Sequence, residues 1–183
     1  SFHNNIKQLS NHYRIYLLDF PGGAGRSIPS EAMLTKRDVA AWLGESIAQI
    51  EKNHRIRATY FVQSNLLDDN IDLLQEISNL GHEVTYHYDV LDSNKGDMIA
   101  AIEEFSDNVS RFREFGFEVR TVCPHGNPIM QRDGWSSNKD FFRNTDVVEL
   151  YPHVFDVVVQ VKDVVKSKVA YISDAGYGWK LIG

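Results

Sequence analysis

The sequence predicts an α/β fold built around a parallel sheet. Short β-branched and aromatic runs alternate with segments of helical periodicity at least three times along the 183 residues. This alternation is typical of right-handed βαβ units, in which successive strands are parallel. The pattern leaves open whether the sheet is flat or curls into a barrel. The length suits one domain over residues 1–183.

The first half of the chain supplies the clearest alternation. Thr35 is a candidate N-cap, and Gly81 and other turn residues separate the elements. The expected elements are a strand at 13–18, a helix with the stripe Val39, Leu43, Ile47 and Ile50, a strand at 56–62, a helix at 71–80 and a strand at 83–86.

The second half begins with the strongest helical signal. Its apolar stripe is Met98, Ile102, Phe105, Val109, Phe112 and Phe115, ended by Gly116. We then expect a strand at 117–122, an irregular polar and aromatic region at 130–145, strands at 157–161 and 169–172, and a turn at 174–176.

Composition excludes several classes of function. The formal charge of −6 argues against nucleic-acid binding, and the lone Cys123 excludes a disulfide framework or a multi-cysteine zinc site. No apolar run is long enough for a transmembrane segment, and no leader is evident, which favours the cytoplasm. The chain stops at Gly183 within an expected strand, so we expect truncation at the C-terminus. Oligomeric state is not predicted.

Polar residues follow the expected strands and suggest a metal site. Asp19, His87, His125 and Asp174 each come after a strand, and the carboxyl ends of parallel strands share one edge of a sheet. Asp19, His87 and His125 could hold a divalent metal, with water completing the site. The alternative for His87 is a hydrogen-bonded histidine at a strand end. His82 is expected to be structural, bonded to the backbone of a neighbouring loop.

Other residues near this edge are candidates for binding substrate. Asp89 could orient a ligand, bind substrate or cap the following turn. Tyr88, Trp135 and Trp179 could contribute to an aromatic platform for a sugar ring, with core packing as the alternative and the better interpretation for Trp179.

Four segments resemble motifs of the polysaccharide deacetylases of the NodB-homology group, carbohydrate esterase family 4. They are Ala58-Thr-Tyr-Phe-Val62, Gly81-His-Glu-Val-Thr-Tyr-His-Tyr-Asp89, Thr121-Val-Cys-Pro-His-Gly-Asn-Pro128 and Ile172-Ser-Asp-Ala-Gly-Tyr-Gly-Trp179. The likeness spans about residues 14–179. It implies a distorted (β/α) barrel, often seven-stranded, and a metal, commonly zinc, that activates water to hydrolyse an acetyl group from a carbohydrate, as in polysaccharide biosynthesis.

The resemblance also implies roles for particular residues. His87 matches the first metal histidine of the second motif, Asp19 matches an aspartate of the first motif, and His125 lies in the strand-end turn of the third. The general base is the alternative role for Asp19. Asp174 would support the site, and Trp179 belongs to the same motif. The chain departs from the family at Leu18, at Phe20-Pro21 and at Leu91, where the second histidine is usual, and it ends before the late catalytic histidine.

We therefore expect a metal-dependent carbohydrate deacetylase. Two alternatives stay open: a catalytically inactive member that binds a glycan or a protein, and a glycoside hydrolase on the same scaffold. The latter would pair Asp19 with Asp89 or Asp174, with carboxyl groups about 5–9 Å apart.

Overall fold

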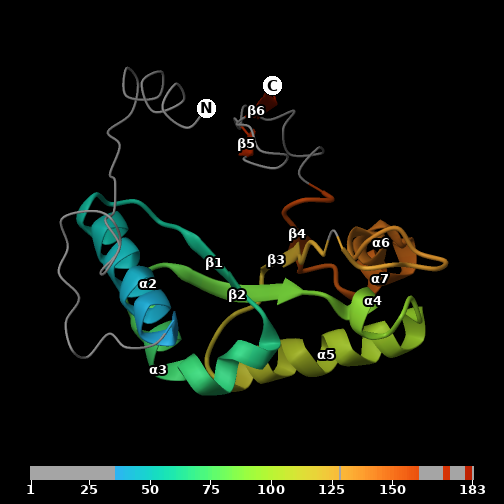
Figure 1. The fold of residues 1–183 in the computed structure, drawn as a ribbon, viewed down its shortest axis with the longest axis horizontal. Helices are drawn as coiled ribbons and strands as arrows, with labels where there is room; N and C mark the ends of the chain where they lie inside the picture. Colours follow the sequence, from blue (N-terminus) through green and yellow to red (C-terminus); the bar gives the residue numbers. More distant parts are fainter. Residues whose placement is uncertain (1–35, 128, 161–170, 174–179, 183) are drawn as a thin grey trace. The chain divides into compact units, whose positions relative to one another are not determined.

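The computed structural model describes residues 36–127, 129–160, 171–173 and 180–182, with side chains described from residue 44 to residue 160 (Figure 1). The chain divides into two compact units, Gly44–Val164 and Ser1–Leu43 with Val165–Gly183. The first unit contains the candidate site. In the second, β5 (Tyr171–Ser173) and β6 (Lys180–Ile182) form an antiparallel pair, near the strand expected at 169–172.

A four-stranded parallel sheet is the framework of the larger unit. Its strands are β1 (Thr59–Val62), β2 (Glu83–Tyr88), β3 (Thr121–Pro124) and β4 (Phe155–Asp156), hydrogen-bonded in that order. The predicted α/β fold with a parallel sheet is confirmed. The four strands do not show a seven-stranded barrel, which stays a prediction.

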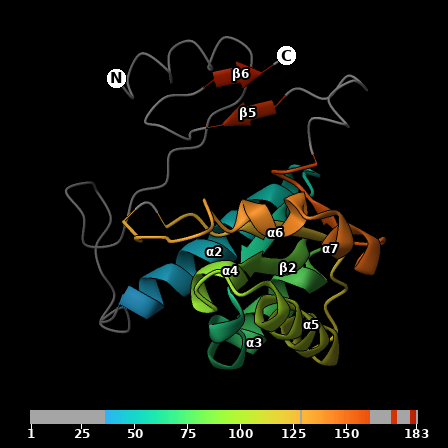
Figure 2. The ribbon, with the colours of Figure 1, turned by 90° about the vertical axis from the view of Figure 1, so that its right-hand side faces the viewer.

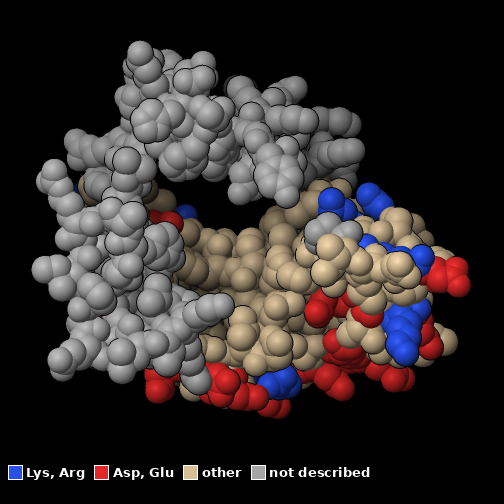
Figure 3. Space-filling model, in the orientation of Figure 1, with Lys and Arg blue, Asp and Glu red and all other residues tan. Residues whose placement is uncertain are grey.

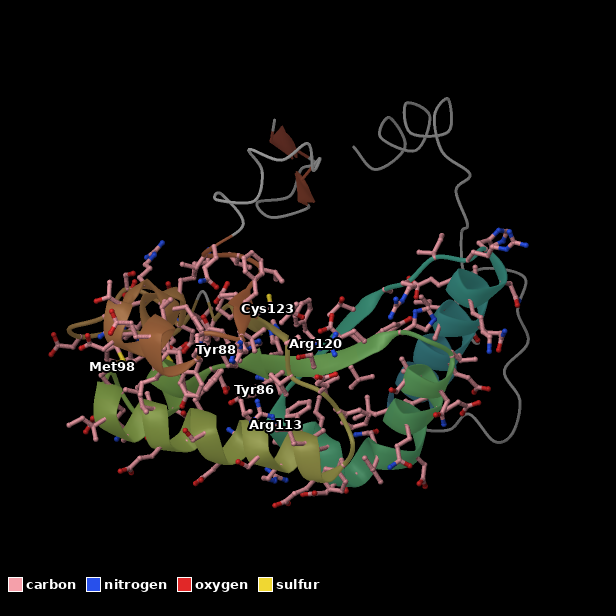
Figure 4. All side chains as sticks on the ribbon, turned by 180° about the vertical axis from the view of Figure 1, so that it is seen from behind. Tyr86, Tyr88, Met98, Arg113, Arg120 and Cys123 are labelled. Carbon is pink, nitrogen blue, oxygen red and sulfur yellow. The ribbon has the colours of Figure 1, made fainter. Side chains whose placement is uncertain are left out.

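Helices α3 (Leu67–Asn79) and α5 (Met98–Glu114) lie along one side of β2 (Figures 1 and 2). Tyr86 points from β2 toward α5, whereas Cys123 of β3 lies on the opposite side of the sheet (Figure 4). The rings of Phe105 and Phe112 lie 5.5 and 5.4 Å from that of Tyr86. The alternating side-chain directions of β2 therefore give the sheet one apolar, helix-covered face.

The rest of the helices surround this core. Helix α2 (Lys36–Asn53) contributes the buried Ala48, and the short helices η1 (Ser64–Leu66) and α4 (Val90–Ser93) follow β1 and β2. Helices α6 (Lys139–Arg143) and α7 (Thr145–Leu150) complete the unit. Phe141 and Phe142 of α6 are buried against Phe105, which extends the aromatic core to the carboxyl end of β2.

On the opposite face of the sheet, β2 carries a row of polar side chains. Glu83 accepts hydrogen bonds from the hydroxyls of Thr59 (2.7 Å) and Thr121 (2.9 Å), so its carboxylate links the side chains of three strands. Thr85, two residues along β2, is buried and donates to the carbonyl of Thr121. Parallel strands are usually apolar on both faces because helices cover both. This face is therefore suited to lining a cleft or the inside of a curved sheet.

Several predicted boundaries are confirmed. Helix α3 ends before Gly81 (φ +98°) and α5 before Gly116 (φ +87°), both in the left-handed region that favours glycine. His82 is structural, as expected: its Nε2 lies 2.8 Å from the carbonyl of Ala48, and the amide of Ala58, in the loop before β1, donates to its Nδ1.

Other boundaries were predicted wrongly. Strand β3 begins at Thr121 rather than at residue 117, and the region expected to be irregular contains α6 and the start of α7. Residues 157–159 form a turn instead of a strand, because the carboxylate of Asp156 accepts hydrogen bonds from the amides of Val158 and Val159, both at 2.7 Å. The strand expected at 13–18 and the turn at 174–176 lie outside the described residues.

None of the helices within the described ranges has the length and apolar character needed to cross a membrane.

Candidate functional site

The pairing of β2 with β3 brings two histidines together at the carboxyl end of the sheet. His87 lies opposite Cys123 in the ladder, and the amide of His125 extends the pairing by donating to the carbonyl of Tyr88 at 2.7 Å. His125 follows Cys123 by two residues and thus points to the same side of the sheet. The expectation that His87 and His125 meet at one edge is met.

The two imidazoles are in direct contact. Nε2 of His87 lies 3.0 Å from Nδ1 of His125, and the rings meet nearly edge to face. Burial, reinforced by the charge of His125, lowers the pKa of His87 below its ordinary value of 6.5. The neutral form of His87, which is the form that binds metals, is therefore favoured at neutral pH.

This geometry is compatible with two ligands of one divalent metal. Two nitrogens bound tetrahedrally to zinc lie about 3.3 Å apart, close to the observed separation. Nδ1 of His87 is buried and has no hydrogen-bond partner in the described part of the chain. Among those residues, no third His, Cys, Asp or Glu joins the pair to form a group of three. A complete site would need a ligand from elsewhere, such as Asp19, which lies outside the described residues.

Asp89 directly follows β2, near this pair. Its Oδ2 accepts a hydrogen bond from Nε2 of Gln63 at 3.3 Å, and its side chain does not cap α4. Burial and then the charge of Glu104 raise the pKa of Asp89, while the charge of His125 opposes that shift. Of the roles predicted for Asp89, the capping role is wrong; a role in orienting a ligand or binding substrate stays a prediction.

A second polar cluster behind the histidines was not predicted. The buried carboxylate of Asp92 accepts from Nε and Nη2 of Arg132, both at 2.7 Å, from Nε1 of Trp135 at 2.9 Å and from Nδ2 of Asn138 at 3.0 Å. Although burial acts to raise it, these hydrogen bonds hold the pKa of Asp92 below its usual range. The Asp92 cluster is therefore a fixed ion pair beneath the site.

Asn138 connects the cluster to the loop that carries His125. Its side chain is fully buried, its Oδ1 accepts from the amides of Leu91 and Asp92, and its Nδ2 also donates to the carbonyl of His125 at 3.0 Å. No spacing in the sequence links Asp92 to residues about forty positions later, so sequence reasoning had no signal for this cluster.

Tyr88 and Trp135, two residues predicted to contribute to an aromatic platform, lie in different surroundings. Tyr88 is fully buried, with its hydroxyl donating to Asp156 at 2.5 Å, so the described conformation does not expose it to a substrate. Trp135 is half-buried and held by Asp92. Asp174 and Trp179 lie outside the described residues, so their predicted roles stay predictions.

Two neighbouring side chains, those of Leu91 and Cys123, limit the chemistry that this site can perform. Leu91, at the position of the family's second histidine, is buried in the first turn of α4, and a leucine offers no ligand atom. Burial and then the charge of Asp156 raise the pKa of Cys123 to about 11. The thiol therefore stays protonated at neutral pH, which disfavours a cysteine nucleophile.

A cavity of about 230 Å³ adjoins His125; its lining residues are Pro124, His125, Gly126, Asn127, Arg132, Ser137 and Lys139. A larger one, of about 490 Å³, lies at the amino ends of the strands around His82 and Glu83. We assign function to the smaller cavity because ligands of parallel sheets bind at the carboxyl ends of the strands.

Comparisons of the chain with protein-family models, with curated proteins and with solved structures found no match.

Proposed function

We propose that the chain is a metal-dependent hydrolase that removes acetyl groups from a carbohydrate. The observation that carries the proposal is the 3.0 Å contact between His87 and His125 at the ends of two neighbouring parallel strands. The motifs that contain these histidines resemble those of the NodB-homology deacetylases. The contact is supporting evidence because imidazole nitrogens converge in this way on divalent metals.

Together with Asp19, His87 and His125 would hold the metal, which we propose is zinc or another divalent ion. A divalent ion in such a site lowers the pKa of bound water and polarises the acetyl carbonyl. Asp89 would take up a proton, and its raised pKa, which makes it a stronger base than an ordinary carboxylate, supports this role. Asp174 is proposed to support the site.

The polar face of the sheet supports a barrel of the NodB-homology type. Glu83, Thr85 and His87 alternate along β2 with Tyr86, whose side chain points toward α5 (Figure 4), so they lie on the other side of the sheet. In a (β/α) barrel the helices cover the outside and the strands line the interior. We propose that this face lines the interior of a distorted, seven-stranded barrel, of which β1, β2, β3 and β4 form a part.

Metal binding tests the proposal directly. We expect the protein to bind Zn²⁺ or Co²⁺ in calorimetry, and His87→Ala and His125→Ala each to weaken binding by at least about tenfold. His153→Ala is the matched control, because His153 is exposed in the loop between α7 and β4. The metal-loaded protein should release acetate from N-acetylated oligosaccharides. If the wild-type protein binds no divalent metal, the proposal of a metal-dependent hydrolase is wrong.

A catalytically inactive member of the same fold is the second candidate. It is favoured by the buried Leu91 at the usual position of a metal histidine and by Pro21 in place of an aspartate. Oligosaccharide binding without acetate release, at saturating metal, would select this function. The glycoside hydrolase remains a less supported alternative, since it requires carboxylates outside the described residues.

A further inference from the structure

The cavity beside His125 has an unusual charge for this protein. The whole chain carries a formal charge of −6, and acidic side chains gather along the edge formed by α3 and α5 (Figure 3). The described residues that line this cavity include Arg132 and Lys139 but no carboxylate. The formally charged side chains among these described lining residues are therefore both basic.

Arg132 is already fixed in place. Two of its nitrogens bind Asp92, and Nη2 also donates to the carbonyl of Asn127 at 3.0 Å. Its Nη1 makes no hydrogen bond within the described part of the chain. Because Asp92 already holds the guanidinium, a ligand that accepts a hydrogen bond from Nη1 would bind without the entropy cost of ordering this side chain.

Lys139 supplies the charge that is not neutralised. Asp92 balances Arg132, whereas Lys139 forms no ion pair with any described residue and is exposed. Burial raises the pKa of both Cys123 and Asp156, and the positive charge of Lys139 opposes both shifts. Its electrostatic influence therefore extends to the ends of β3 and β4.

We propose that this cavity binds an oxyanion substituent of a sugar, a carboxylate or a phosphate, with Lys139 and Nη1 of Arg132 as its donors. The substrate class is then an acidic glycan. Calling the ligand a substrate rests on the proposed deacetylase function, whereas the binding of the anion does not.

The test compares glucuronic acid, glucose 6-phosphate and glucose as ligands of the full chain, by calorimetry or by amide chemical-shift titration. We expect at least one acidic sugar to bind about tenfold more tightly than glucose, and Lys139→Gln to remove most of that difference. Lys52→Gln is the matched control, because it removes the same charge at the exposed end of α2. Added salt should weaken binding of the acidic sugars alone.

Equal affinities for the acidic sugars and glucose would overturn the inference, as would equal effects of Lys139→Gln and Lys52→Gln. His87→Ala separates it from the proposed function. If this variant loses metal binding but retains the acidic sugar, the anion site stands by itself. If wild-type protein binds metal but does not prefer acidic sugars, the hydrolase stands and the substrate class is wrong.

Discussion

The imidazole of His87 is held where its positive charge is disfavoured. Burial and the neighbouring His125 both lower its pKa. In a proton NMR titration we expect the His87 resonance, assigned by its absence from His87→Gln, to have a midpoint below 6.5. A midpoint above that value would mean that a partner stabilises the charged ring, contrary to the environment described.

The same shift makes stability depend on pH. As pH falls through 6.5, His87 becomes protonated in the unfolded chain before it does in the folded one, so acid favours unfolding. We expect the free energy of unfolding to fall more between about pH 7.5 and about pH 5.5 in wild type than in His87→Gln. Urea denaturation at both pH values measures this; equal decreases in the two proteins would contradict it.

Asn138 is the residue whose loss should most disturb the site. It makes four hydrogen bonds from a fully buried position, and Asn138→Ala leaves two amides and a carbonyl without this partner. We expect a loss of about 2–4 kcal/mol in unfolding free energy, measured by urea denaturation. Asn79→Ala, at the exposed end of α3, is the control and should change it by less than about 0.5 kcal/mol. A similar small effect at Asn138 would show that the loop is held by other contacts.

The connection between α4 and α5 depends on a glycine that has no room for a side chain. A Cβ on Gly96 would lie 2.5 Å from a ring carbon of Trp135, whereas one on Gly116 would meet nothing within 4 Å. Both glycines have positive φ. We expect Gly116→Ala to cost about 1 kcal/mol through backbone strain, and Gly96→Ala about 1–3 kcal/mol more because Trp135 must move away from Asp92. Equal losses of unfolding free energy in the two variants, measured by chemical denaturation, would mean that Gly96→Ala destabilises through backbone strain alone.

Elements with long-range periodicity and a glycine stop were predictable, and short elements fixed by tertiary contacts were not. The apolar stripe of α5 and its end at Gly116 could be predicted because apolar residues recur at alternating spacings of four and three along a helix of 17 residues. Helix α6 has five residues and no such repeat. Its two phenylalanines are fixed by packing against Phe105 and Tyr88, which are distant in the sequence. Residues 157–159 have β-branched side chains, but Asp156 holds their backbone in a turn.

The candidate site was predictable where it depended on strand order. His87 lies near the carboxyl end of β2 and His125 directly follows β3, and parallel pairing alone brings such residues together. The cluster around Asp92 depends on how the loop after β3 folds back over α4, which is a tertiary contact with no periodic signal. For the same reason the sequence gives no sign that the indole nitrogen of Trp135 binds Asp92, and the role of Trp135 in a sugar platform stays a prediction.

The polar and apolar faces of the sheet bear on the architecture of the whole molecule. Tyr86 and Tyr88 join the helices in one core, whereas Glu83, Thr85 and His87 form a continuous polar row on the same strand. Thr85 is already buried, whereas Glu83 and His87 are half-buried; an open sheet would leave these two partly exposed, and a barrel would enclose them. Enclosure also explains why catalytic groups at the strand ends would be screened from bulk water.

Hydrogen exchange on β1 distinguishes these two architectures. Successive amides of a parallel strand point alternately to its two neighbours, and β1 has only β2 beside it in the described sheet. If the barrel closes, a further strand must pair with the free side of β1, so all four amides from Thr59 to Val62 should exchange slowly. The amides of β2, which is paired on both sides, are the internal reference for full protection. Fast exchange at alternate positions of β1, with slow exchange throughout β2, would mean that β1 is an edge strand and that the barrel is wrong.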